Sequence, residues 1–412
     1  MNNKWVRAVI PALLIHISVG TVYCWSTFKQ SIAEQIGMST FAVGWAFSIA
    51  IFFLGMSAAV FGKIVEMNIH KSSLVSCICF TTGMIGTGLA TKFLSGWVAL
   101  IGIYLCYGVI MGIGLGVGYL TPVKTLMLWF EDNKGLATGI SIMGFGLAKA
   151  IATPIMNILQ NKIGISYMFI VLGIAYFILM FTGHILLRKP NGWIESPDTT
   201  KINIKTLLHD RQLIGIWIMF YLNIHCGLMI ISYEKQILNH AFMGASVLTL
   251  VLNVVPAITA MANAFGRIGY STMSDKLNQR NTVYHGIFIS CIITSSLMIF
   301  IGAFDGYSCI GCIALVIYLI VINLGYGGGF STLPALLSER YGMRQISQIH
   351  GLVLSAWAIA GLTGNNTTEI ILKTTNNYNY VVMIGACLYF IALGFSVVCV
   401  GYKPSKVMEG IK

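Results

Sequence analysis

The segment from Val98 to Leu120 reads VALIGIYLCYGVIMGIGLGVGYL and contains no charged residue. A bilayer has a hydrocarbon core of about 30 Å, which an α-helix crosses with about 20 apolar residues. The segment is therefore long enough and apolar enough to form a membrane-spanning helix. Segments of the same kind recur along the whole chain, so the fold is expected to consist of such helices.

The composition of the chain fits a protein that is surrounded by lipid. Of 412 residues, 57% are hydrophobic and 9% are charged, whereas charged residues make up about 25% of an ordinary soluble domain. A soluble fold needs a polar exterior, which this composition does not supply. The net charge of +12 does not indicate nucleic-acid binding, because lysine and arginine occur singly in the gaps between apolar runs.

Twelve apolar segments predict twelve membrane-spanning helices. They lie near 8–28, 42–62, 73–92, 98–128, 134–160, 165–187, 211–233, 244–271, 283–303, 308–337, 346–371 and 379–401. The longest polar stretch, Arg188–Asp210, separates an N-terminal six-helix half (1–187) from a C-terminal one (211–412) and is predicted to be a cytoplasmic linker. The predicted fold class is an all-α membrane protein with two pseudo-symmetric halves.

The positive charges predict how the chain is oriented. With a cytoplasmic N-terminus, the inner segments contain 17 lysines and arginines and the outer segments contain five. Cytoplasmic loops carry an excess of these residues. We therefore expect both ends of the chain on the cytoplasmic side of the inner (plasma) membrane. Lys4 and Arg7 precede a run that is long enough to span, which favours a first helix over a cleaved signal.

The two halves also resemble each other in sequence. Three residue pairs are separated by the same 209 positions: Glu66 and Asp275, Lys71 and Arg280, and His16 and His225. In addition, GVGYLTP at 116–122 resembles GGGFSTLP at 327–334. Weak repeats of six helices are typical of transporters that are built from two similar halves.

Three cations remain within the predicted spans: Lys124, Lys149 and Arg267. A charged side chain that faces lipid costs about 2.5–3.5 kcal/mol or more, so these residues are expected to face protein or water. All 13 carboxylates fall in loops, tails or helix ends by the predicted spans. The membrane interior is therefore predicted to carry positive charge without a carboxylate partner, and a transported anion would supply the negative charge.

Each of these cations also has an interpretation that involves no solute. The long stem of Lys124 would allow its ammonium group to snorkel to the inner surface. Lys149 could be uncharged, because burial disfavours an ammonium ion, and it could then carry a proton. Arg267 cannot lose its proton, but it could bond to helix carbonyls as a structural brace.

Three stretches of the sequence resemble the oxalate/formate antiporter family of the major facilitator superfamily. They are GTVYCWSTF at 20–28, GYLTPVKTLMLWF at 118–130 with KGLATG at 134–139 and GFGL at 144–147, and NAFGR at 263–267 with SDK at 274–276. The structural loop motif of the superfamily is partly kept in both halves, at Gly62, Glu66 and Lys71 and at Asp275, Lys276 and Arg280. The resemblance covers almost the whole chain.

This resemblance implies a central cavity lined mainly by helices 1, 4, 7 and 10. In the oxalate carrier of the family, a helix 8 arginine and a helix 11 lysine bind the dicarboxylate. Arg267 matches the arginine, whereas Trp357 stands where the lysine would align. The resemblance therefore favours lactate or pyruvate over oxalate. A small dicarboxylate stays open, because Lys124 and Lys149 could supply a second positive pole.

Five further residues are candidates for substrate binding: Tyr23, Tyr119, Trp357, His16 and His225. The tyrosines and Trp357 would shape a pocket for a carboxylate with a short carbon tail, although they could equally be packing residues. Histidine changes its charge near neutral pH. The two histidines could therefore couple transport to protons, or they could be ordinary hydrogen-bonded groups.

Other aromatic and sulfur-containing residues have structural interpretations. Trp25 and Trp129 lie near predicted helix ends and are interpreted as residues of the membrane interface. The pairs Cys77/Cys79 and Cys309/Cys312 lack a histidine or a second cysteine pair at metal-ligand spacing. No metal site and no cofactor is therefore predicted.

The sequence thus predicts a secondary active transporter that moves a small organic anion across the lipid bilayer by alternating access. The anion would be a monocarboxylate such as lactate, pyruvate or formate, or a small dicarboxylate, and a counter-anion or a proton would drive the movement. We expect no enzymatic activity, no nucleic-acid partner and function as a monomer. The alternatives are transport of an uncharged solute such as a sugar, and a non-transporting membrane sensor.

Overall fold

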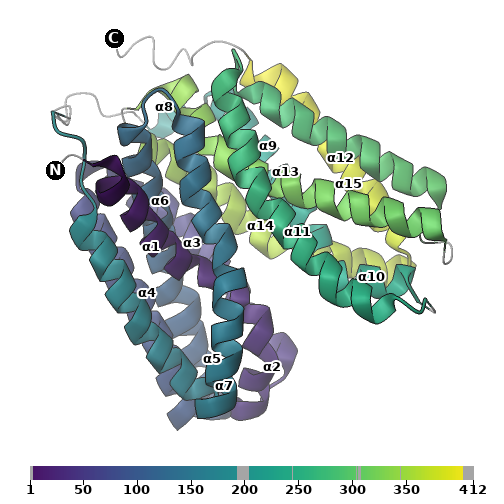
Figure 1. Cartoon of the computed structure of the whole chain (residues 1–412), viewed down its shortest axis with the longest axis horizontal. Helices are drawn as coiled ribbons and strands as arrows, with labels where there is room; N and C mark the ends of the chain where they lie inside the picture. The colour runs from purple at the N-terminus through teal and green to yellow at the C-terminus, as the bar shows by residue number, and fades with distance from the viewer. Residues whose placement is uncertain are drawn as a thin grey trace. The chain divides into compact units, whose positions relative to one another are not determined.

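The computed structural model describes residues 3–192, 204–243, 245–302, 304, 308–343 and 345–401 (Figure 1). These residues form helices joined by turns, and no strand occurs among them. Part of the predicted linker, at 193–203, lies outside the described residues. So do five of the cations that were assigned to the cytoplasmic side: Lys201, Arg344, Lys403, Lys406 and Lys412. The all-α fold class is confirmed.

The first six predicted spans correspond to ten helical elements. They are η1 (Trp5–Val9), α1 (Ile10–Val19), η2 (Gly20–Cys24), α2 (Trp25–Ile36), α3 (Thr40–Met67), α4 (Ile69–Phe93), α5 (Gly96–Ile103), η3 (Tyr104–Met111), α6 (Gly112–Trp129) and α7 (Lys134–Leu186). The first four elements form one continuous span, Trp5–Ile36, and α5, η3 and α6 form another, Gly96–Trp129. Helix 1 is thus longer at its C-terminal end than the sequence predicted.

The remaining spans correspond to nine elements. They are α8 (Ile204–Leu208), α9 (Arg211–Ile231), α10 (Glu234–Ala241), α11 (Leu248–Lys276), α12 (Asn281–Ile301), α13 (Cys309–Tyr341), α14 (Ile346–Thr375), α15 (Tyr378–Phe395) and η4 (Ser396–Val400). Side chains cap several of these helices. Asp210, Ser308 and Asn377 accept hydrogen bonds from backbone N–H groups of the first turns of α9, α13 and α15, which satisfies donors that a helix leaves unpaired.

Eleven helices in the described part of the chain are long and apolar enough to cross a bilayer. One of them, α7, has 53 residues, and Gly164 interrupts it with φ 79° and ψ 166°. Glycine adopts this backbone conformation without the steric cost that other residues meet. The break separates the predicted spans 134–160 and 165–187, so the structure agrees with a twelve-helix fold.

Contacts divide the chain into two compact units. Unit 1 contains Met1–Thr199 and Met343–Ala358, and unit 2 contains Thr200–Gly342 and Ile359–Lys412. The first part of α14 therefore belongs to unit 1, and the rest of this helix belongs to unit 2. The division into halves at 188–210 stays a prediction.

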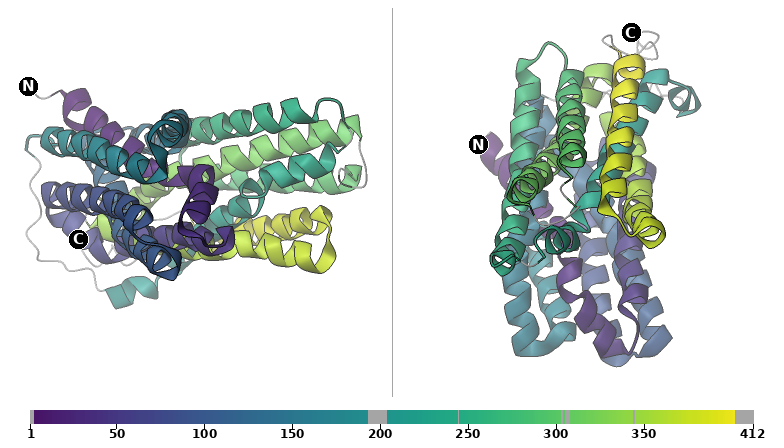
Figure 2. Two further views of the ribbon diagram at one scale, coloured as in Figure 1. Left: turned by 90° about the horizontal axis from the view of Figure 1, so that it is seen from below. Right: turned by 90° about the vertical axis from the view of Figure 1, so that its right-hand side faces the viewer.

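In unit 1, α7 packs against α1 and α4, and α6 packs against α3 and α4 (Figures 1 and 2). Small residues bring the first part of α14 close to α3. A Cβ atom added to Gly62 of α3 would lie 2.6 Å from the carbonyl oxygen of Ser347. Gly62, which belongs to the predicted loop motif, therefore allows two helix backbones to touch.

In unit 2, α13 packs against α11 and α12, and α15 packs against α9 and α12 (Figures 1 and 2). Gly327 of α13 lies directly against the carbonyl oxygen of Asn263 on α11. A larger side chain at this position would push α11 away from α13. The close approach matters because Asn263 contacts a residue of the candidate site.

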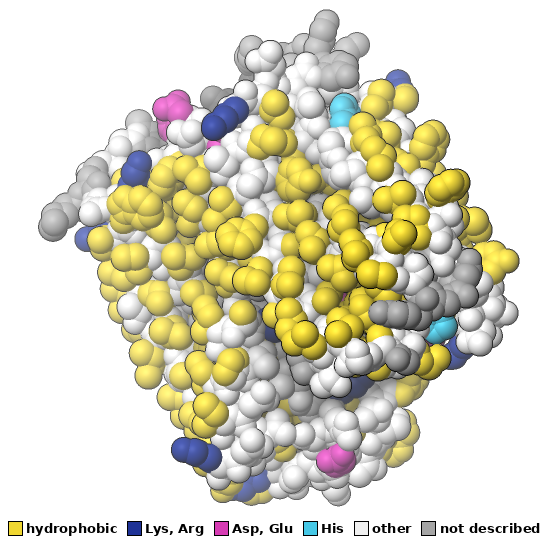
Figure 3. Space-filling model, turned by 45° about the vertical axis from the view of Figure 1, so that its right-hand side comes forward, with side chains coloured by type: hydrophobic (Ala, Val, Ile, Leu, Met, Phe, Trp, Pro, Cys, Tyr) yellow, Lys and Arg dark blue, Asp and Glu magenta, His cyan; other side chains and the backbone are white. Residues whose placement is uncertain are grey.

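The surface of the molecule is mostly apolar. Hydrophobic side chains are spread over much of the face seen in Figure 3, where charged side chains are few. Large side chains such as Phe93, Phe265 and Phe300 are 70%, 68% and 89% exposed. Such exposure is unfavourable in water, whereas lipid tails solvate apolar side chains. The surface is therefore suited to a bilayer.

Candidate functional site

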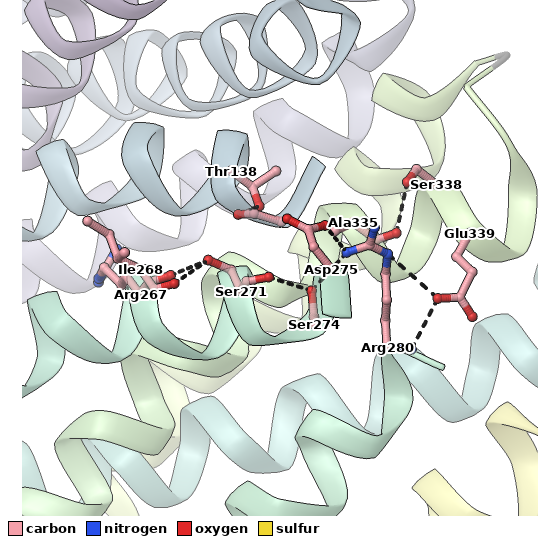
Figure 4. A network of polar contacts seen from close by, with 11 residues as sticks. Thr138, Arg267, Ile268, Ser271, Ser274, Asp275, Arg280, Ala335, Ser338 and Glu339 are labelled. Carbon is pink, nitrogen blue, oxygen red and sulfur yellow. Dashed lines mark hydrogen bonds and ion pairs between the residues drawn. The ribbon is translucent and has the colours of Figure 1, made fainter. Parts of the chain in front are cut away.

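Arg267 is a buried cation on α11 in unit 2, and its side chain is 2% exposed. Its Nε donates a hydrogen bond to Oδ1 of Asn263, one helical turn earlier, at 3.0 Å. Ser271, one turn later, donates from Oγ to the carbonyl oxygen of Arg267 at 2.5 Å (Figure 4). Because arginine stays protonated in proteins, α11 holds a permanent positive charge at this position.

An aromatic ring lies beside the guanidinium group of Arg267. Its Cζ atom is 5.6 Å from the ring centroid of Phe330 on α13, a distance at which a cation and a ring attract each other. Phe330 is itself held by Phe220 and Tyr326, whose ring centroids are both 5.1 Å away. The side chain of Arg267 is therefore positioned by a neutral amide and by a fixed ring.

The loop motif of unit 2 forms a network around Arg280 (Figure 4). Its Nη1 donates to Oδ1 of Asp275 at 2.6 Å and to Oγ of Ser274 at 2.8 Å. The backbone N–H of Arg280 donates to Glu339 of α13 at 3.1 Å. Two predicted motif residues, Asp275 and Arg280, are thus brought together, whereas the third, Lys276, is exposed.

The corresponding acid in unit 1 has a different partner. Lys124 of α6 is 2% exposed, and its Nζ lies 2.7 Å from Oε1 of Glu66. The prediction that Lys124 lacks a carboxylate partner is wrong. The predicted second span ended at 62, which left Glu66 in a loop, but α3 continues to Met67. Glu66 therefore lies on the last turn of a helix, within reach of the long lysine side chain.

Glu66 also caps the start of α14. Its Oε2 accepts a hydrogen bond from the backbone N–H of Ser347 at 3.0 Å. A negative charge is favourable at a helix N-terminus, where N–H groups lack partners within the helix. One carboxylate thus connects α3, α6 and the first part of α14, while the predicted motif residue Lys71 is exposed.

Four of the predicted binding residues meet in one aromatic cluster of unit 1. Phe145 of α7 is at its centre, with ring centroids at 5.5 Å from Tyr23, 5.8 Å from Tyr119, 6.0 Å from His16 and 6.0 Å from Trp357. Tyr119 also stacks on His16 at 5.5 Å. Elements α1, η2, α6, α7 and α14 thus bring together residues that are far apart in the sequence.

His16 is completely buried in this cluster, at 0% exposure. Its Nδ1 lies 2.6 Å from the carbonyl oxygen of Ser141, and its Nε2 lies 3.2 Å from the carbonyl oxygen of Tyr119. Both ring nitrogens are therefore within hydrogen-bond distance of backbone oxygens. These contacts connect α1 to α6 and α7.

His225, the counterpart of His16 in the repeat, has different surroundings in unit 2. Its Nδ1 lies 2.9 Å from Oγ1 of Thr363 and 3.3 Å from the hydroxyl group of Tyr221. The hydroxyl oxygens of Tyr221 and Thr363 are 3.0 Å apart. His225 thus belongs to a small polar group of side chains, whereas His16 lies near two backbone oxygens and one hydroxyl group, that of Ser141.

Lys149 lies on α7, one helical turn after Phe145, and is exposed. Residues four positions apart lie on the same face of a helix, so Lys149 shares a face with Phe145 and Thr153. Thr153 contacts Cys24 of η2, with 3.7 Å between Oγ1 and Sγ. No ion pair of Lys149 occurs among the described residues. Its predicted role in substrate binding stays a prediction.

The interpretation of Trp25 as an interfacial residue is wrong. Trp25 is 3% exposed, and its ring centroid lies 4.2 Å from Tyr107 and 5.3 Å from Phe28. The predicted first span ended at 28, whereas the helix continues to Ile36. Trp25 therefore lies well inside the helix and packs in the core of unit 1.

Sequence reasoning missed three residues that contact the candidates. Asn263 could have been found, because it lies four positions before Arg267 and thus on the same helix face. Phe330 lies in the repeated segment 327–334, but nothing in the sequence places its ring beside Arg267. The ring centroid of His350 of α14 is 5.8 Å from that of Tyr119. This contact follows from the packing of α14 in unit 1, which the sequence does not reveal.

The twelve-helix architecture and the buried cation define a polytopic membrane protein of the transporter class. A family model described as Major Facilitator Superfamily matches residues 12–365. The chain therefore belongs to the Major Facilitator Superfamily, as its resemblance to the oxalate/formate antiporters implied.

Curated relatives match nearly the full chain at low identity. The uncharacterized MFS-type transporter YhjX of Escherichia coli (strain K12) is 23% identical, over 88% of this chain and 86% of the relative. The oxalate:formate antiporter of Oxalobacter formigenes is 22% identical, over 100% of this chain and 95% of the relative. Apicoplast pyruvate carrier 1 of Toxoplasma gondii is 21% identical, over 97% and 89%.

Solved structures confirm the predicted fold. The proton:xylose symporter XylE superposes with a TM-score of 0.71 at 15% identity, covering 98% of both chains. A bacterial homologue of the iron transporter ferroportin, in an outward-facing state, superposes with a TM-score of 0.73 at 11% identity, over 94% of this chain and 98% of the other. At these identities the likeness concerns the fold alone.

Proposed function

We propose that this chain is a secondary active transporter of a small organic anion, and that Arg267 binds a carboxylate group of that anion. The observation that carries the proposal is the burial of a permanent cation in a membrane-spanning helix, positioned by Asn263 and Phe330. Ionisable residues are rare within membrane-spanning segments and commonly mark substrate pathways. An arginine side chain is also well suited to hold a carboxylate with two parallel hydrogen bonds.

The substrate class is a monocarboxylate such as lactate, pyruvate or formate, or a small dicarboxylate. The names of two relatives support this class, since one is an oxalate:formate antiporter and another a pyruvate carrier. Antiport with a second anion and symport with a proton are both compatible with it. We assign Lys124 to the ion pair with Glu66, which leaves Arg267 as the principal anion-binding cation.

The other predicted binding residues remain part of the proposal. Tyr23, Tyr119, Trp357 and His16 form the aromatic cluster of unit 1, and apolar rings with polar edges are suited to a short carbon tail. Lys149 and His225 are kept as candidates for the positive field and for coupling. We further propose an inner-membrane location, a monomeric state and cytoplasmic ends, which reporter fusions at both ends would test.

Uptake into proteoliposomes tests the proposal. The purified protein is given labelled formate, oxalate, lactate, pyruvate and xylose, with the counter-solute and the pH gradient varied. We expect uptake of at least one anion, and we expect Arg267→Gln to reduce it at least about tenfold, as the loss of a charged hydrogen bond predicts.

A matched arginine variant controls for general damage. Arg211 is exposed, and its Nη2 donates to the carbonyl oxygen of Val398 at 3.2 Å, so Arg211→Gln is expected to transport like the wild type. Preferred uptake of xylose that Arg267→Gln leaves unchanged would contradict the proposal and favour an uncharged solute.

A further inference from the structure

His350 is a buried polar residue of unit 1 that takes no part in the ion pair between Glu66 and Lys124. It lies in the first part of α14 and is 2% exposed. Its Nε2 is buried and has no hydrogen-bond partner among the residues that the structure describes. Nearly all buried polar atoms in proteins are hydrogen-bonded, so an unpartnered one calls for a physical reason.

Tyr119 allows a direct comparison of two histidines, because its ring contacts both. The ring centroid of His16 lies 5.5 Å from that of Tyr119, and the ring centroid of His350 lies 5.8 Å from it. Both nitrogens of His16 are within hydrogen-bond distance of carbonyl oxygens. A histidine that serves packing in this cluster is thus supplied with partners, whereas Nε2 of His350 is not.

The position of His350 on α14 connects it to the aromatic cluster of unit 1. His350 and Trp357 are seven residues apart and therefore lie on the same helix face. Both contact Tyr119, with ring centroids at 5.8 Å and 5.7 Å. On the preceding turn, Ser347 also has a buried Oγ without a partner in the described part of the chain. This face of α14 thus combines unpartnered polar atoms with Trp357 of the aromatic cluster.

We propose that His350 is a solute-binding residue, and that its Nε2 forms a hydrogen bond with an oxygen atom of the transported organic anion. This inference rests on the proposed function, because the anion is the ligand. An imidazole nitrogen donates to a carboxylate or keto oxygen when it carries a proton, and accepts from a hydroxyl group when it does not. Leaving a buried polar atom unpaired is unfavourable for the empty protein, and the anion would remove that cost.

The test combines stability and binding in His350→Leu. An apolar side chain removes the unpartnered atom, so the melting temperature without solute is expected to stay the same or rise. Binding of the anion that the wild type takes up best is expected to weaken about tenfold or more. Affinity is measured from the solute-dependent shift of the melting temperature and from the KM of uptake.

Two further variants of His350 and one control variant keep the test decisive. If His350→Leu does not fold, His350→Phe keeps the ring contact with Tyr119 and is measured in the same way. His350→Gln keeps a hydrogen-bonding side chain and is expected to recover part of the affinity. Trp25→Phe is the matched control, because it removes another buried unpartnered atom of unit 1, Nε1, in a residue outside the proposed site. Its affinity is expected to equal that of the wild type.

The outcomes separate this inference from the proposed function. Wild-type affinity in the Leu and Phe variants, with uptake lost in Arg267→Gln, would overturn the role of His350 alone. Lower stability with unchanged affinity would also overturn it, since that result marks a structural residue. If the wild-type protein takes up no anion at all, the proposed function fails. Weaker binding without lower stability supports the proposal.

Discussion

Unit 1 and unit 2 each end their second long helix in an acid, and each acid forms an ion pair, but the cations come from different places. Asp275 of unit 2 pairs with Arg280, five residues later, at 2.6 Å. Glu66 of unit 1 pairs with Lys124, which is 58 residues away on α6. The repeat thus keeps the acid at an equivalent position while the partner has changed.

The repeated segment explains why only unit 1 offers a lysine. Lys124 follows Pro122 by two positions, and the residue at the same place after Pro334 in unit 2 is Leu336. Leu336 is completely buried and, being uncharged, cannot form an ion pair with Asp275. The two units therefore pair a carboxylate at a helix end with different cations: a distant lysine in unit 1 and a nearby arginine in unit 2.

The largest expected effect separates the two ion pairs. Glu66→Gln leaves the buried ammonium group of Lys124 without a charged partner, which costs about 3–5 kcal/mol of stability. It also weakens the hydrogen bond to Ser347 at the start of α14. We expect a much lower apparent melting temperature of the purified protein in detergent.

A double variant controls this experiment. Glu66→Gln combined with Lys124→Met removes both charges, and replacing a buried ion pair with apolar groups is often close to neutral. Most of the lost stability is therefore expected to return. A single Glu66→Gln protein that melts like the wild type would show that Lys124 does not depend on Glu66.

The pair in unit 2 is expected to be less sensitive. In Asp275→Asn, Arg280 still has Ser274 at 2.8 Å and a second carboxylate, that of Glu339, at 3.6 Å. Arg280 is also 14% exposed. The expected loss is roughly 1–2 kcal/mol, as for one charged hydrogen bond. The melting temperature is measured in parallel with that of Glu66→Gln. Glu339→Gln, which removes the other acid near Arg280, is the matched control. A loss as large as that of Glu66→Gln would contradict the ranking.

The histidines of the two units, like the acids, occupy equivalent sequence positions but have different partners. His16 and His225 occupy equivalent positions in the repeat, but His16 lies between backbone oxygens of α6 and α7. His225 instead contacts the side chains of Tyr221 and Thr363. Equal spacing in the sequence therefore predicts where a residue lies in the fold, and not what surrounds it.

The positions of the membrane helices could be predicted from the sequence, because the signal is local. A run of about 20 apolar residues is sufficient to mark a span, and this includes the two parts of α7 that Gly164 separates. Helix ends could not be predicted as well, because they continue past the apolar run into polar residues. For this reason the apolar pattern predicts a helix end at Trp25 and a loop at Glu66, whereas both residues lie within helices.

The candidate site could be predicted only in part, for a related reason. Arg267 was found because a charge within an apolar run is conspicuous. Its partner Asn263 could also be predicted, because it lies four positions earlier on the same helix face. Nε2 of His350 is unpartnered only because of how α14 packs on unit 1, and packing between segments more than 200 residues apart leaves no signal in a single sequence.

The smallest expected effect concerns Lys189, which follows α7 in unit 1 and is repelled by Lys124 of the ion pair in that unit. Burial, and then the positive charge of Lys124, lower the pKa of Lys189 to about 8, whereas an ordinary lysine titrates near 10.4. Between about 8 and 10.4 the folded protein therefore binds fewer protons at this site than the unfolded chain. Burial of the charged form of Lys189 therefore destabilises the folded protein below about pH 8, and this cost is relieved as the pH rises through that range.

Acylation of amines followed by mass spectrometry measures this shift, because only the deprotonated amine reacts. The labelling rate of Lys189 is expected to level off near pH 9 in the folded protein, whereas in the denatured protein it is expected to keep rising with pH. Lys124→Met removes the repelling charge, so it should move the Lys189 profile towards higher pH. Identical profiles of Lys189 in the folded and the denatured protein, or no response to Lys124→Met, would show that the buried pair of unit 1 does not act on its surroundings.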